Sequence, residues 1–150
     1  MDSTADTTEA AESVLQTIGL VSVELKVSPT ERFKETELYY IFSITRPQRG
    51  PGDHFYFMCE LECGRKLPDE EDPATAVEVR YGCFLKRSVE TEEAALQSAL
   101  NVSRYAIWAK FSDLFMLVTS QMGIDFPPLP ADPGKINITD VDDTSDSQDD

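Results

Sequence analysis

The sequence is poor in the side chains that most enzymes use for catalysis. Of its 150 residues only His54 is a histidine, and no serine or cysteine nucleophile stands beside it in a recognisable motif. Neither a glycine-rich phosphate loop nor a Ser/His/Asp arrangement is present. We therefore expect a protein that is not an enzyme and has no cofactor, with His54 as an ordinary residue at the start of a strand.

Cysteine is also scarce, and the three present, Cys59, Cys63 and Cys83, are an odd number that disfavours a disulfide framework. Cys59 and Cys63, four residues apart on a strand, would lie ~13 Å apart at ~3.3 Å per residue. That separation is too large for a shared zinc ion held at ~2.3 Å. Glu70, Glu71 and Asp72 lack the alternating ligands and central glycine of a calcium loop. We expect buried thiols, a solvated acidic loop and no metal site.

The chain lacks long apolar runs and basic residues. No apolar run reaches the ~20 residues needed to span a bilayer, and the acidic start of the chain is unlike a signal peptide. We expect a cytoplasmic protein without stable membrane insertion. Lysine and arginine total 13 against 28 acidic residues, for a formal net charge of −15. We therefore expect no nucleic-acid partner, because binding to phosphates depends on a surplus of basic residues.

Four segments alternate between apolar and polar residues as half-buried strands do: 21–27, 38–45, 55–62 and 77–85. The connections between them are short, which favours antiparallel pairing, since parallel neighbours need a crossover of about a dozen residues. The second and third segments are apolar on the other face as well, at Tyr39, Ile41, Tyr56 and Met58. A sheet that is apolar on both faces is normally covered on both faces.

A long helical segment follows the strands. It begins near Glu90–Glu93, where acidic residues suit the positive end of the helix dipole, and ends at Gly123. We expect one apolar stripe of this helix to lie on the sheet; its members are Ile107, Phe111, Leu114, Val118 and Met122. Tyr105, Trp108 and Phe115 are expected to point elsewhere. A helix that is apolar around most of its circumference has a second face to bury. That second face predicts contact with another subunit, a ligand or a client polypeptide.

These elements predict a single α+β domain: a four-stranded antiparallel sheet followed by a long helix packed on one face. We place the domain at residues 14–138, between an acidic arm (1–13) and an acidic tail (139–150) that are both expected to be disordered. A set of aromatic residues has two open interpretations. These residues either belong to the ordinary core, or they line an apolar groove or an oligomer interface. The set comprises Tyr39, Tyr40, Phe42, Tyr105, Trp108 and Phe126.

The order of elements and several short motifs resemble the SecB protein-export chaperone family. Val77–Phe84 (VEVRYGCF) is similar to the last strand of that family, which has a Glu-Val pair followed by Gly and Phe. Ile107-Trp108, Gly123 and Phe126–Leu129 are similar to its long helix and Phe-Pro-x-Leu exit. Lys135–Ile138 resembles the Val-Asn-Phe segment that follows. The terminal helix of the family is missing and the acidic tail stands in its place, which indicates a divergent member.

The resemblance implies an ATP-independent holdase that binds unfolded or precursor polypeptides and assembles as a homotetramer, a dimer of dimers. Leu38, Tyr40 and Phe42 match groove residues of the family, and Phe126 and Leu129 match the segment that borders the groove. We add Tyr105 and Trp108 to this groove on their chemistry alone. Glu24, Ala76 and Glu78 correspond to the patch where the export motor SecA docks, although Lys26 reverses a sign expected there.

A different class of function explains the acidity and the surplus apolar residues equally well. The chain is alternatively a dedicated interaction module, such as an acidic inhibitor or an antitoxin partner with one cognate target. A hot-dog-type enzyme also wraps a sheet around a long helix. In that fold the helix precedes most strands, whereas here it follows all four, and no acid or base is placed to serve it.

Overall fold

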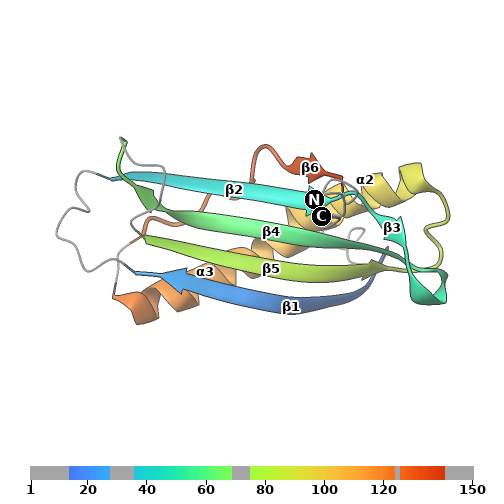
Figure 1. The fold of residues 1–150 in the computed structure, drawn as a ribbon, viewed down its shortest axis with the longest axis horizontal. Coiled ribbons are helices and arrows are strands. Elements are labelled where there is room, and N and C mark those ends of the chain that lie inside the picture. Colours follow the sequence, from blue (N-terminus) through green and yellow to red (C-terminus); the bar gives the residue numbers. More distant parts are fainter. Residues whose placement is uncertain (1–13, 28–35, 69–74, 124–125, 141–150) are drawn as a thin grey trace, which may run out of the picture.

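The protein, described here from a computed structural model, is built on one mixed sheet with a long helix behind it (Figure 1). The structure describes residues 14–27, 36–68, 75–123 and 126–140. Four long strands form the body of the sheet: β1 (Leu15–Lys26), β2 (Glu37–Thr45), β4 (Phe55–Lys66) and β5 (Thr75–Leu85). Their order is β1-β5-β4-β2, and each neighbouring pair is antiparallel. The predicted α+β architecture with four antiparallel strands is therefore correct, but the simple meander that the short connections favour is not, because β1 pairs with β5 rather than with β2.

Two short strands were not predicted. β3 (Gln48–Arg49) pairs with the start of β4, and β6 (Asn137–Thr139) extends the sheet beyond β2. β6 runs parallel to β2, which is possible because the helix lies between them in sequence and forms the crossover. Thr139, expected to begin the acidic tail, is the last residue of β6. The predicted arm (1–13), the remaining tail (141–150) and the Glu70–Asp72 loop lie outside the described residues.

The helical segment is one continuous run in three parts: α2 (Glu92–Val102), a π-helical turn η3 (Ser103–Ile107) and α3 (Trp108–Met122). Thr91 caps its start by accepting a hydrogen bond from the backbone N–H of Ala94 at 3.1 Å. Gly123 ends it in the left-handed conformation, φ 70°, as predicted. Within the described residues no helix is long and apolar enough to cross a membrane.

The helix covers one face of the sheet, which we call the inner face. In Figure 1 it runs obliquely behind the sheet, from the side of β6 towards that of β1. The apolar residues of β4 and β5 alternate as predicted, and those on the inner face form the core; examples are Phe57, Leu61, Val79 and Leu85. No described helix covers the other face, which we call the outer face.

The predicted stripe of the helix is wrong in part. The side chains that α3 buries are Trp108, Phe111, Phe115 and Thr119. Leu114, Val118 and Met122, expected to lie on the sheet, are only half-buried. The π turn explains the difference, since its extra residue per turn rotates the following helix about its axis. Both patterns step by three and four residues, so periodicity alone does not distinguish them.

Candidate polypeptide-binding surface

The three predicted groove residues of β2 share the inner face but differ in depth. Leu38 and Tyr40, towards the start of the strand, are 39% and 36% exposed, whereas Phe42 is buried. Phe42 pairs with Leu61 on β4, within the region that the helix covers. β2 therefore leaves the core at its N-terminal half and presents Leu38 and Tyr40 to solvent there.

Trp108 is a core residue in this subunit rather than a surface one. It is 3% exposed, and its ring centroid lies 5.4 Å from that of Tyr40 and 6.0 Å from that of Phe42. Its indole Nε1–H donates a hydrogen bond to the carbonyl oxygen of Pro130 at 2.8 Å. Tyr105, one turn earlier, is half-buried. The structure brings the rings of Tyr40, Phe42 and Trp108 together, and of these three residues only Tyr40 is exposed.

Residues 126–136 run back over the helix towards β6, and we call this segment the strap. It carries Phe126 and Leu129, the two predicted border residues of the groove, and both are half-buried against the core. The ring of Phe126 meets Phe115 edge-on at 5.1 Å, and the Arg65 guanidinium lies 5.3 Å from its centroid. Both predicted border residues therefore lie on the strap and pack against the core.

Arg104, in the π turn, attaches the middle of the strap to the helix. It forms an ion pair with Asp132 at 2.7 Å and donates a second hydrogen bond to the carbonyl of Gly134 at 3.0 Å. Arg104 and a backbone hydrogen bond from Gly134 hold the pKa of Asp132 below its usual value. No sequence pattern indicates this contact, since Arg104 and Asp132 are 28 residues apart and belong to no motif.

Six aromatic rings form a continuous series from β2 through the helix to the strap, and we call it the aromatic ladder. Successive centroids are 5.1–6.0 Å apart, with the Trp108 ring adjacent to both β2 rings. Its members are Tyr40, Phe42, Trp108, Phe111, Phe115 and Phe126. Such contacts are each worth about 0.5–1.5 kcal/mol beyond area burial. Phe111 and Phe115 had been assigned to the helix but not to the groove.

A second apolar region lies between β1 and α3. A trough of ≈350 Å³ is lined by Ile18, Leu20, Tyr81, Lys110, Asp113 and Leu114. Val23 and Leu25 face the same side, because they pair directly with the buried Val79 and Val77 of β5. Leu20 and Leu25 are nevertheless 53% and 51% exposed, and Leu117 of α3 is 62% exposed. The helix therefore leaves the β1 part of the inner face exposed.

The predicted motor-docking residues lie together on the edge of the sheet. Glu24 of β1 and Glu78 of β5 are direct cross-strand partners, and Ala76 pairs with Lys26. Glu24 is exposed, Glu78 is half-buried and Ala76 is buried. Only the two carboxylates of this set are therefore available to a partner.

Glu78 also pairs directly with Glu62 of β4, so three glutamates form a row across neighbouring strands. Like charges directly opposite one another destabilise a sheet. Arg80 offsets part of this repulsion through ion pairs with Glu60 at 3.4 Å and Glu78 at 3.7 Å. Tyr39 donates a hydrogen bond to Glu62. Burial is the main cause that raises the pKa of Tyr39, and the Glu62 carboxylate raises it further.

The cysteines and the histidine show no arrangement typical of catalysis or metal binding. All three cysteines are free thiols and buried, and burial raises the pKa of Cys63 to about 12. The Cys59 Sγ lies 3.7 Å from the Oγ of Ser103 in the π turn. His54 Nδ1 is 2.8 Å from the carbonyl oxygen of Leu85. No cluster of ligand residues suited to a metal ion occurs among the residues that the structure describes.

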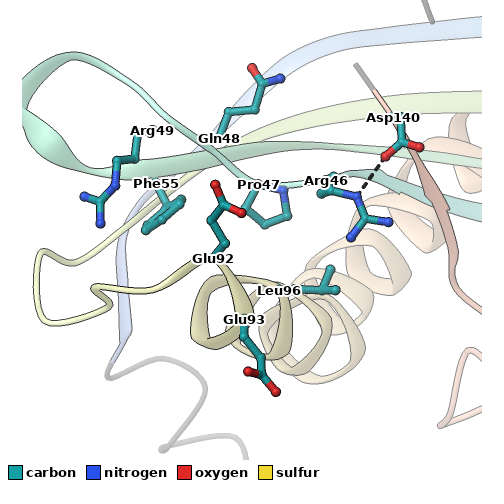
Figure 2. A pocket seen from close by; sticks show the side chains of 9 residues that line it. All are labelled: Arg46, Pro47, Gln48, Arg49, Phe55, Glu92, Glu93, Leu96 and Asp140. Carbon is teal, nitrogen blue, oxygen red and sulfur yellow. Dashed lines mark hydrogen bonds and ion pairs between the residues drawn. The ribbon is translucent and has the colours of Figure 1, made fainter. Parts of the chain in front are cut away.

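A cavity of ≈580 Å³ is lined by none of the predicted site residues. It lies where the β2–β3 turn faces the start of α2, and Figure 2 shows Arg46 and Asp140 paired on one side of it. Arg46 pairs with Asp140 at 2.8 Å and Arg49 with Asp53 at 2.9 Å. Glu92 and Glu93 complete the charged rim. Charges of both signs on its rim make this cavity a poor match for an apolar polypeptide segment.

The fold is similar to one already solved, the Mycobacterium tuberculosis SecB-like chaperone Rv1957 in complex with a ChAD peptide from the antitoxin HigA1 (Rv1956). The TM-score is 0.56 at 14% sequence identity, and the match covers 83% of this chain and 95% of that chain. The protein therefore has the fold of a SecB-like chaperone. No protein-family model and no curated protein sequence matches the chain.

Proposed function

We propose that this protein is a cytoplasmic, ATP-independent holdase that binds unfolded or precursor polypeptides and catalyses no reaction. One observation carries the proposal: large apolar side chains are exposed on a well-packed SecB-like fold, on strands at opposite sides of the sheet. Leu38 and Tyr40 lie on β2, and Leu20 and Leu25 lie on the edge strand β1. Exposed apolar patches on a folded domain mark interaction sites.

The edge of β2 supports binding of extended chains. β6 pairs only with Ser43–Thr45, so within the described residues Glu37–Phe42 have no strand partner on that side. An extended client segment that pairs there gains main-chain hydrogen bonds, while its alternate side chains reach Leu38 and Tyr40. Affinity would then come from the backbone, which suits a chaperone with many clients.

Assembly as a homotetramer is part of the proposal. β1 is an edge strand of 12 residues, and among the described residues no strand pairs with its free edge. Its inner-face residues are exposed beside α3. A second copy that pairs with β1 would cover both the free edge and the β1–α3 trough. Unprotected long apolar edge strands otherwise promote uncontrolled association.

The experiment that tests the holdase proposal is suppression of aggregation. Reduced α-lactalbumin is allowed to aggregate with and without stoichiometric protein in the absence of nucleotide, and light scattering is followed. We expect scattering to fall as the protein approaches one assembly per client. Unchanged scattering at a several-fold excess would contradict the proposal.

The second candidate function is a dedicated module with one cognate target, such as an antitoxin partner. It is favoured by the neighbouring structure, in which a SecB-like chaperone holds a peptide from one antitoxin. Affinity capture with the purified protein separates the two functions. Many unrelated unfolded chains support the holdase, and one stoichiometric native partner supports the module.

Docking of the SecA export motor is proposed through Glu24 and Glu78 alone, because Ala76, which pairs with Lys26, is buried. Titration of purified SecA against the protein and a Glu24→Lys, Glu78→Lys variant tests it. We expect binding by the unmodified chain and at least about tenfold weaker binding by the variant, since rim charges govern such encounters. Equal binding by both proteins would remove these residues from the motor site.

A further inference from the structure

The aromatic ladder has one exposed end and several buried rings, and the strap lies against it. Trp108 touches the strap through Pro130, and Phe115 touches it through Phe126. Pro133 of the strap is buried and Ile136 is half-buried. An ideal side-chain Cβ built on Gly134 would lie 3.9 Å from the Tyr40 hydroxyl. The strap therefore approaches the ladder near both ends and at its middle.

The strap is weakly attached for a segment that covers core residues. Four of its eleven residues are proline (127, 128, 130 and 133), which have no backbone N–H to donate. Within the described residues no backbone–backbone hydrogen bond joins residues 126–136 to another segment. In the part of the chain that the structure describes, two side chains of the helix hydrogen-bond to it, those of Trp108 and Arg104. Segments with so few bonds are the first to open locally.

We propose that the strap is a gate over the aromatic ladder, held closed by the Arg104–Asp132 ion pair. This inference rests on the proposed function. When the strap lifts, Trp108 joins the surface that Leu38 and Tyr40 already expose, and aromatic or large aliphatic side chains of a client take the place of Phe126 and Leu129. Client binding shifts the equilibrium towards the open form because only that form offers these rings.

The gate accounts for the burial of Trp108, which a fixed groove does not explain. A surface with Trp108 permanently exposed would promote self-association, whereas the closed strap keeps this ring covered. The clasp is suited to reversible opening, since Arg104 and Asp132 side chains are 33% and 66% exposed. An ion pair with that exposure contributes little and is screened by salt.

Trp108 is the only tryptophan, so its indole Nε1–H gives a single resonance that reports on the strap. The experiment measures the hydrogen-exchange rate of this proton by NMR in the full-length protein without any client. Arg104→Gln and Asp132→Asn should each raise the rate by about threefold to tenfold, because each removes the same charged contact. The double variant should exchange no faster than the faster single variant, since the two residues share one interaction.

Arg80→Gln is the matched control, because it removes an exposed ion pair on the outer face and should leave the indole exchange rate unchanged. Urea unfolding of each variant shows whether exchange reflects local opening: the rate should rise with urea far less steeply than global unfolding does. Unchanged exchange in both Arg104→Gln and Asp132→Asn would overturn the gate, as would exchange that follows global unfolding.

Addition of excess reduced α-lactalbumin then separates the gate from the holdase function. If the client binds and the indole resonance shifts, both stand. A client that binds while the indole resonance and its exchange stay unchanged refutes the gate and leaves the holdase intact. Faster exchange in the variants without any client binding supports the strap opening but refutes the proposed function.

Discussion

Tyr40 and Trp108 lie with their ring centroids 5.4 Å apart, yet Tyr40 is 36% exposed and Trp108 only 3%. The boundary between the surface and the core thus falls between two adjacent rings. The difference also decides which of them can be mutated as a test of binding. A charge at Tyr40 remains in contact with water, whereas an unpaired charge at Trp108 would be buried and would unfold the domain.

The first prediction concerns the exposed end of the ladder. Leu38→Asp with Tyr40→Asp should raise the protein concentration needed for half-suppression of α-lactalbumin aggregation by about tenfold, since central aromatic contacts dominate such interfaces. Ile41→Asp is the control, because Ile41 lies on the same strand, is 48% exposed and faces the outer side. Equal loss in both variants would place the binding site elsewhere.

The second prediction concerns assembly through β1. Leu25→Asp should lower the oligomeric state measured by native mass spectrometry, or weaken association by at least about tenfold, because it buries a charge at the expected interface. Glu24→Gln changes the neighbouring residue on the outer face and should leave the mass unchanged. If the unmodified protein is a monomer at micromolar concentration, the assembly proposal is wrong.

The third prediction tests the rotated face of α3. Phe115→Ala should lower the free energy of unfolding by about 3–5 kcal/mol, as expected for a fully buried phenylalanine. Met116→Ala should change it by no more than about 0.5 kcal/mol, because Met116 is exposed. Urea denaturation followed by circular dichroism measures both. Similar losses from the two variants would mean that α3 presents a different face to the sheet.

The fourth prediction concerns alkaline pH. Burial raises the pKa of Cys63 from 9.0 to about 12, and that of Tyr81 from 10.0 to about 12. The folded state therefore holds these protons more tightly than the unfolded chain does. Their contribution to stability is complete below pH 9 and is lost as the pH rises from 9 to 12.

Urea unfolding under reducing conditions at pH 8, 9, 10 and 11 should show this loss. Cys63→Ala should make the decline shallower, while Tyr81 still contributes part of it. A stability that stays constant from pH 8 to 11 in the unmodified protein would contradict the prediction. An unchanged slope in Cys63→Ala would show that the thiol does not contribute.

Alternation and end signals predicted most of the fold. The four long strands, their antiparallel pairing and the end of the helix at Gly123 all follow from local patterns. β6 was missed because three residues give no periodicity, and their pairing with β2 depends on a partner almost 100 residues away. The burial of Trp108 and Phe115 was missed because the π turn leaves no mark in an i, i+3, i+4 pattern.

The candidate site was predicted only as a set of residue types. Leu38, Tyr40 and Phe42 fall on one face because strand geometry places alternate residues together. Nothing local indicates that Phe42 is buried while Tyr40 is not, since that depends on where the helix and the strap cross the sheet. The clasp between Arg104 and Asp132 is likewise a tertiary contact between two unremarkable sequence positions.

The glutamate row on the outer face has a consequence for self-recognition. Glu24, Glu78 and Glu62 stand among exposed apolar neighbours such as Val21 and Ile41, on a face that no described helix covers. Two copies that stacked these faces would bring six carboxylates into one dry layer, which electrostatic repulsion forbids. The row therefore disfavours face-to-face stacking of like sheets, which leaves the β1 edge for the proposed assembly, and the like charges destabilise the sheet slightly.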